Sequence, residues 1–189
     1  MFFPSHKMLR QIFPICLAVT LALASSHVQA AQVSQQERQA KAEARLQKEV
    51  RHVLVTQPFY TVFDNLAFKI DGDRVTLLGQ AVSPTLKIDA GNAVKAIEGV
   101  SAVDNQIEIL PPSPADRQIR RAEFRAIYSA PGMQKYSIQA VPPIHIIVKN
   151  GHVTLVGVVA NEMDKTLANA RANSVLGVFS VQNDLTVEK

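Results

Sequence analysis

Two histidines in the second half of the chain have the residue type and the close spacing that suggest a shared metal ion. His145 and His152 flank Asn150-Gly151, a dipeptide that strongly favours a two-residue hairpin turn. In that hairpin Lys149 faces His152 and His145 faces Val156, which separates the two histidines by roughly 13 Å. Two ligands of one zinc ion each lie about 2 Å from the metal. We therefore predict no metal site and interpret both as surface or interface histidines.

Other residue types used in catalysis form no recognisable group. No serine stands in a nucleophile-elbow pattern, and no glycine-rich phosphate loop is present. Asp71, Asp73 and Asp104 fall at turns or solvent-facing strand positions, without an evident partner for acid–base chemistry. We predict a protein that is not an enzyme and needs no cofactor.

One predicted helix concentrates positive charge and aromatic residues. Phe124, Ile127 and Tyr128 recur at i, i+3 and i+4 among four arginines. A basic helix with aromatic residues is typical of contacts with anionic headgroups. The alternative is that the aromatic residues are core and the arginines a solvated face, partly offset by Asp116 and Glu123. If the protein contacts anionic lipid, the predicted contact residues are Arg117, Arg120, Arg121, Phe124, Arg125 and Lys135.

An internal repeat sets the elements that position these residues. Val75-Thr-Leu-Leu-Gly79 returns 78 positions later as Val153-Thr-Leu-Val-Gly157. The same offset relates Gly99-Val100 to Gly177-Val178 and holds without a gap from about Ile70 to Glu108. A period this long that occurs twice indicates two copies of one small domain rather than a solenoid.

Each copy has the pattern of a helix, a hairpin, a second helix and a last strand. In the first copy we expect a helix over 31–55, a hairpin turning at Gly72-Asp73, a helix from Ser83-Pro84 to Gly99, and a strand over 103–109. Gly79, on the apolar face of the hairpin, predicts close approach of a helix. The fold class is α+β: two tandem αββαβ domains, each a small three-stranded sheet covered on one face by two helices.

Four polar residues have predicted structural roles. Asp116 is expected to cap the first helix of the second copy, which runs to about Ser129, and Asn161 to cap the next helix. Asn105 and Asn183 fall on the buried side of the last strand in their copies. We expect each amide to tie down a neighbouring loop backbone rather than bind a ligand.

The N-terminus has the features of a secretory signal peptide. Lys7 and Arg10 precede an apolar run from Ile12 to Ala24, and Val28-Gln29-Ala30 is a cleavage signature. The run is shorter than the roughly 20 residues of a spanning helix, so we favour cleavage over retention as an anchor. The predicted domains are 1–30 signal peptide, 31–110 first copy with a start that could be a disordered tail, 111–115 Pro-rich linker, and 116–189 second copy.

Export predicts a periplasmic or secreted protein. Cys16 is the only cysteine and falls in the signal, so the mature chain has neither disulfides nor a thiolate metal site. Removing Lys7 and Arg10 leaves 18 basic and 16 acidic residues, a net charge of +2. A nucleic-acid binder usually concentrates much more positive charge, so no nucleic-acid partner is expected.

The repeated motif resembles the BON domain, a family of exported bacterial modules that includes OsmY-like proteins. The resemblance is a hairpin ending in Val-x-Leu-x-Gly, a helix closing on Gly-Val, and a strand of the form Val-x-Asn-x-Leu-x-Val. The first helix and the start of the hairpin do not align between the copies without gaps. The matching residues are Val75, Leu77, Gly79, Gly99, Val100, Val103, Asn105 and Ile107, and again Val153, Leu155, Gly157, Gly177, Val178, Val181, Asn183 and Leu185.

The resemblance implies a non-enzymatic binding module of the bacterial cell envelope. Its expected partners are phospholipid surfaces or envelope components, with peripheral membrane association. Two alternatives are a periplasmic chaperone-like protein that takes up unfolded clients, and a structural module that packs into oligomers. Apolar residues on the outer sheet faces keep the chaperone alternative open: Ala67, Leu78, Ile147 and Val156.

Overall fold

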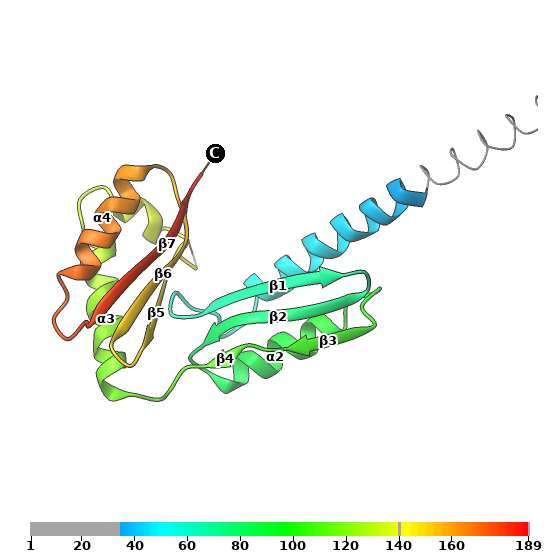
Figure 1. The fold of residues 1–189 in the computed structure, drawn as a ribbon, viewed down its shortest axis with the longest axis horizontal. Coiled ribbons are helices and arrows are strands. Elements are labelled where there is room, and N and C mark those ends of the chain that lie inside the picture. Colours follow the sequence, from blue (N-terminus) through cyan, green and yellow to red (C-terminus); the bar gives the residue numbers. More distant parts are fainter. Residues whose placement is uncertain (1–34, 140, 189) are drawn as a thin grey trace, which may run out of the picture. The chain divides into compact units, whose positions relative to one another are not determined.

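The computed structural model describes residues 35–139 and 141–188 (Figure 1). The predicted signal peptide, residues 1–30, lies outside the described residues. The chain divides into two units, residues 1–45 and 46–189, and these are considered separately. Residues 35–45 are helical and every one of them is exposed.

The helix continues to residue 55 in the second unit, where it covers the first sheet. Leu46, Val50 and Leu54 recur at every fourth position and are buried in the core of the first copy. This spacing places one apolar stripe on the sheet and leaves the remaining faces to solvent. Pro58 follows three residues beyond the last helical position, as expected for a residue that disfavours helix before it.

The first sheet is built on the predicted hairpin. Strand β1 (Asn65–Asp71) pairs antiparallel with β2 (Arg74–Ala81), and Ile70 faces Val75 across the turn, as the turn residues predict. Helix α2 (Pro84–Lys95) follows, with Ser83 at the N-cap and Pro84 at the first helical position. Strands β3 (Ala102–Asn105) and β4 (Glu108–Ile109) then run parallel to β2.

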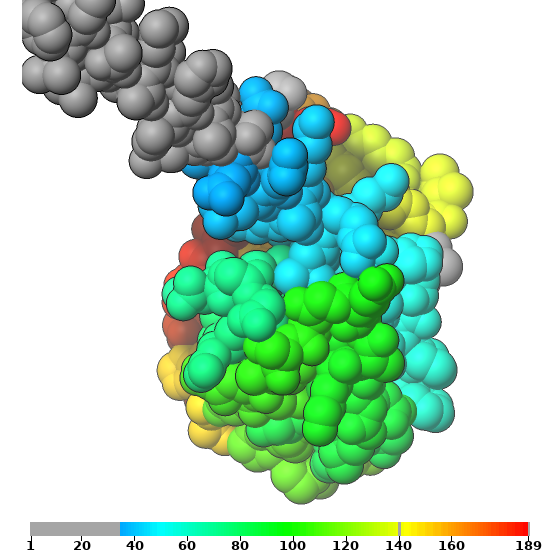
Figure 2. Space-filling view, turned by 90° about the vertical axis from the view of Figure 1, so that its right-hand side faces the viewer, coloured from blue at the N-terminus to red at the C-terminus, as the bar shows by residue number. Residues whose placement is uncertain are grey.

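The second copy repeats this order. Helix α3 (Pro114–Tyr128) and the short 3₁₀ helix η1 (Gln134–Ser137) precede β5 (Ile144–Lys149) and β6 (His152–Val159). Helix α4 (Glu162–Asn173) is capped by the Asn161 side chain, as predicted, and β7 (Ser180–Val187) lies parallel to β6. The predicted fold class is confirmed: each copy has its own sheet and its own hydrophobic core (Figure 1). Figure 2 shows closely packed side chains without a deep hollow on the face of the first copy that it presents.

The predicted reason for the glycine at position 79 was wrong. Gly79 does not make room for a helix, because a Cβ there would lie 2.0 Å from the carbonyl oxygen of Asn65 on the paired strand. Gly157 has the same relation to the carbonyl oxygen of Pro143, at 1.9 Å. Both glycines have positive φ angles, 105° and 133°, which L side chains rarely adopt. The requirement comes from the hairpin backbone itself.

The helices also end earlier than the glycine signals suggest. Helix α2 ends at Lys95 with Ala96 as its C-cap, and Gly99 takes up a left-handed φ of 94° three residues later. Helix α4 ends at Asn173, ahead of Gly177. In the second copy, α3 begins at Pro114, inside the predicted linker.

The two strand asparagines make equivalent hydrogen bonds between sheet and helix, which we call the asparagine pins. The Asn105 side chain donates to the carbonyl of Lys87 in α2 at 2.7 Å, and Asn183 donates to the carbonyl of Lys165 in α4 at 3.0 Å. The amide oxygens accept from the backbone two residues on, at 3.3 Å in both copies. The prediction of a backbone tie holds, but the partner is a helix rather than a loop.

The copies also contact one another through the segment that leads into β1. The backbone N–H of Ile146 on β5 donates to the carbonyl of Val62 at 2.8 Å. Val62 is 7 % exposed and is part of the core of the second copy, with Phe63 packed against it. The first copy therefore covers part of the β5 edge.

Candidate binding surface

Two side chains fix the start of α3, Ser113 as its N-cap and Asp116 through hydrogen bonds to another element. The helix is capped by Ser113, whose hydroxyl accepts from the N–H of Asp116 at 3.1 Å. The prediction that Asp116 is the cap was therefore wrong. Its carboxylate instead accepts from the N–H groups of Asn150 and Gly151 at 2.9 and 2.8 Å, and the residue is 1 % exposed. Asp116 thus joins α3 to the β5–β6 turn, and its carboxylate is not exposed at the surface.

The second acidic residue of α3 is also removed from the surface. Glu123 is fully buried, and neither carboxyl oxygen has a hydrogen-bond partner among the described residues. Burial raises the pKa of the Glu123 carboxyl to about 8, so it is mostly protonated at neutral pH. It lies midway in a buried stripe between Ile119 and Ile127.

Three arginines remain on the outer face of this helix. Arg117, Arg121 and Arg125 recur at every fourth position and are all exposed. Within the described residues, none of the three forms an ion pair. Both acidic residues of α3 are buried, so neither carboxyl group is exposed beside this cluster. The helix therefore presents a stripe of positive charge, which we call the arginine face.

The other three residues of the predicted site serve the fold. Arg120 is 5 % exposed, and its Nη2 donates to the carbonyl of Val148 at 2.7 Å. Phe124 packs partly buried against the core, with its ring 4.8 Å from that of Tyr128. The helical period explains the division, since positions 120 and 124 turn toward the sheet whereas 117, 121 and 125 turn away.

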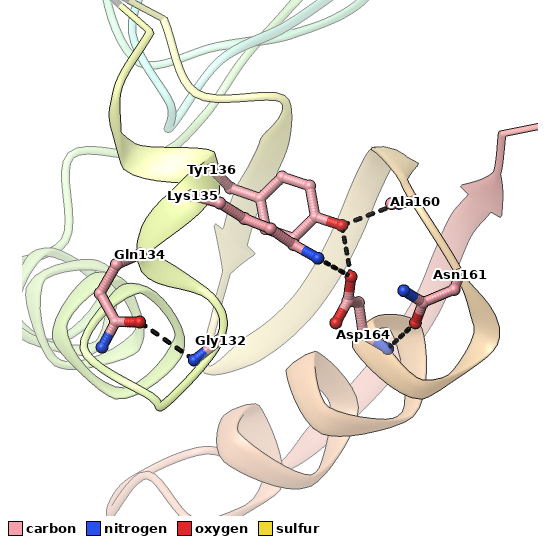
Figure 3. A network of polar contacts seen from close by, with 7 residues as sticks. All are labelled: Gly132, Gln134, Lys135, Tyr136, Ala160, Asn161 and Asp164. Carbon is pink, nitrogen blue, oxygen red and sulfur yellow. Dashed lines mark hydrogen bonds and ion pairs between the residues drawn. The ribbon is translucent and has the colours of Figure 1, made fainter.

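Lys135 belongs to a network that fixes η1 on the start of α4 (Figure 3). Its Nζ lies 2.7 Å from Oδ2 of Asp164. The Tyr136 hydroxyl donates to the same oxygen at 2.6 Å and accepts from the N–H of Ala160 at 2.7 Å. These contacts hold the pKa of Asp164 below its usual value, chiefly through Lys135. The lysine is half-exposed, but its charge is matched within the domain.

The histidines lie where the hairpin register places them. Lys149 pairs with His152 and His145 with Val156, as predicted. His145 is an interface residue: its ring stacks on Tyr60 of the first copy with centroids 5.3 Å apart, and burial lowers its pKa. In the described part of the chain, no three metal-ligating side chains come together.

The loop between α4 and β7 carries exposed apolar residues that the sequence reasoning missed. Leu176 is 94 % exposed and Phe179 is 77 % exposed. The N–H of Phe179 donates to the carbonyl of Gly151 at 2.9 Å, so the loop is tied to the same turn that Asp116 binds. A comparison of the two copies could have found them, because the equivalent residues of the first copy are Glu98 and Ser101.

Part of the outer face and part of the β5 edge of the second sheet, which the chaperone alternative would use, are covered. Ile147 on that face is 5 % exposed, and the neighbouring N–H of Ile146 donates to the carbonyl of Val62.

Among residues 35–139 and 141–188, no helix is both long enough and apolar enough to cross a bilayer.

Comparison with known proteins relates the repeat to one family. The model of the BON domain matches residues 37–111 and 133–189, which is more than half of the chain. Two solved structures of CdsD, a structural protein of the type III secretion system of Chlamydia trachomatis, are similar at 13 % sequence identity. They cover 75 % and 76 % of this chain and 96 % and 92 % of their own, with TM-scores of 0.31, too low to bear on function. No curated protein matches the sequence.

Proposed function

Because the chain belongs to the BON domain family, we propose that it is a non-enzymatic binding module of the bacterial cell envelope that associates with anionic phospholipid surfaces. The proposal includes export to the periplasm and cleavage after Ala30. The chain would then act as a peripheral protein, bound through the second copy. The first copy would orient and stabilise it.

The observation that carries this proposal is the arginine face of α3. Its three exposed guanidinium groups lie along one stripe, while Asp116 and Glu123 are buried. Each basic side chain near an anionic membrane contributes about 1 kcal/mol to binding. Three together correspond to roughly a 100-fold change in affinity. An electrostatic contact of this kind also weakens as salt screens it.

Vesicle co-sedimentation of residues 31–189 tests the proposal. We expect binding to phosphatidylglycerol vesicles, little binding to phosphatidylcholine vesicles, and loss at high salt. The triple variant R117S/R121S/R125S should bind about 100-fold more weakly.

A matched control removes the same charge from the first copy. Lys41, Lys48 and Arg51 are exposed on its helix, and K41S/K48S/R51S should bind nearly as well as the unaltered protein. Equal loss in both triple variants would mean that net charge, rather than the arginine face, determines binding. Equal binding of the α3 variant and the unaltered chain would contradict the proposal.

A further inference from the structure

The loop 174–179 exposes two large apolar side chains without a structural need in its own domain. Single exposed apolar residues are common on protein surfaces. Here two lie three positions apart, Leu176 at 94 % and Phe179 at 77 % exposure. The same loop of the first copy has Glu98 and Ser101, so the fold itself accepts polar residues at both positions.

The Phe179 ring is held in place although it is exposed. Gly151 has a φ of 79°, and a Cβ there would lie 2.6 Å from Cδ2 of Phe179. The equivalent residue of the first copy is Asp73, whose carbonyl accepts the same backbone hydrogen bond from the N–H of Ser101 at 2.9 Å, but Ser101 has no ring to place against the turn. His152 lies beside the Phe179 ring, with centroids 5.9 Å apart. One side of the ring therefore rests on the turn while most of its surface faces outward, a preorganised arrangement that lowers the entropic cost of binding.

The sequence around this loop lacks negative charge. Residues 165–183 contain Lys165 and Arg171 but no acidic residue, whereas the equivalent residues 87–105 contain three. Those three positions have become apolar or neutral in the second copy: Asp89 is replaced by Leu167, Glu98 by Leu176 and Asp104 by Gln182. Arg171 is exposed in the last turn of α4, immediately before the loop.

The arginine face begins at the same end of the domain. Asp116 binds the turn at Asn150 and Gly151, and Phe179 binds Gly151. The next residue after Asp116 is Arg117, the first member of the arginine face. A Cβ at Gly177 would lie 3.8 Å from Ile119, which places the loop against the first turns of α3.

We propose that Leu176 and Phe179 form an apolar anchor that enters the headgroup–acyl boundary of an anionic bilayer beside the arginine face. This deepens the proposed function and rests on it. An anionic bilayer fits because it supplies both an apolar layer for the two side chains and negative charge for the surrounding basic residues. A protein partner would leave the acyl region untouched and is distinguished by the test below.

The absence of tryptophan from the chain makes a site-specific probe available. We would place one tryptophan by F179W and, as the matched control, one by S101W at the equivalent loop of the first copy. With phosphatidylglycerol vesicles, the F179W emission should shift to the blue and be quenched by brominated acyl chains. The S101W emission should show neither change.

A double substitution measures the contribution of the anchor to vesicle binding. L176S/F179S should weaken binding to these vesicles roughly tenfold and leave the salt dependence in place. The control I138S/M163S removes two side chains of the same copy that are 83 % and 79 % exposed, and it should bind like the unaltered chain. Circular dichroism of both variants confirms that they are folded.

The outcomes separate this inference from the proposed function. Salt-sensitive vesicle binding without quenching of F179W, or with full binding by L176S/F179S, overturns the anchor and leaves the function standing. Failure of the unaltered chain to bind anionic vesicles overturns both.

Discussion

The two copies share a framework and differ in what they place on it. Leu46, Val50 and Leu54 fill the helix stripe that covers the first sheet, each at 6 % exposure or less. The corresponding stripe of α3 has the same spacing, but its middle position is Glu123. The second copy thus carries a carboxyl group without a hydrogen-bond partner among the described residues where the first copy has Val50, and burial keeps that carboxyl group mostly neutral at neutral pH.

The same contrast recurs at the loops after α2 and α4. Both loops contain a glycine with a left-handed φ, Gly99 at 94° and Gly177 at 89°. Around this common turn the first copy has Glu98 and Ser101, and the second has Leu176 and Phe179. At these loops, both copies have the glycine that the backbone conformation needs, whereas the exposed residues around it differ. The proposed binding surface uses residues of the second copy at positions where the two copies differ.

The largest expected effect tests the shared framework. G157A should destabilise the protein by at least about 4 kcal/mol, because the new Cβ would overlap the Pro143 carbonyl at a φ of 133°. G79A should behave alike. G72A meets no neighbouring atom and has only its φ of 62° to oppose it, which costs about 1 kcal/mol. Urea denaturation measures all three, and a G157A variant as stable as G72A would refute the hairpin clash.

The next effect concerns Glu123, the main difference between the cores. Its pKa is about 8 when folded, against an ordinary value of 4.5. Between these values the folded state keeps a proton that the unfolded state releases, so stability falls as pH rises. We expect a loss on the order of 3 kcal/mol from pH 4.5 to pH 8.5.

The variant E123V installs the residue type of the first copy with little change in volume. It should abolish most of that pH dependence and be more stable than the unaltered chain at pH 8.5. V50E should create a similar slope in the first copy. Chemical denaturation at four pH values measures it, and equal slopes for E123V and the unaltered chain would show that Glu123 is not the titrating group.

Much of the framework was predictable because its signals are local. The Gly72-Asp73 and Asn150-Gly151 turns fix the registers of both hairpins, and Ser83-Pro84 fixes the start of α2. Helix ends were less predictable, since Gly99 and Gly177 mark later turns rather than the last helical residues.

The binding surface was only partly predictable because it depends on contacts distant in sequence. Asp116 is buried by a turn that lies 34 residues away, and Arg120 by a carbonyl 28 residues away. From the sequence of α3 alone, one cannot tell which of its four arginines and two acidic residues are exposed and which are buried. Leu176 and Phe179 required a different signal, the departure of one copy from the other.

The smallest expected change in stability comes from removing one of the asparagine pins, the hydrogen bonds of Asn105 and Asn183. N183L removes the donor to the Lys165 carbonyl and the acceptor for the Leu185 N–H, and N105L removes the equivalent pair. Each should cost about 1–2 kcal/mol, and the two costs should agree within roughly 0.5 kcal/mol. The exposed Asn173 provides the control, since N173L should change stability by less than about 0.5 kcal/mol. Thermal denaturation would measure all three variants. A large cost in only one copy would mean that the pins, unlike the hairpin glycines, have diverged, and that the framework is less equivalent than its hydrogen bonds indicate.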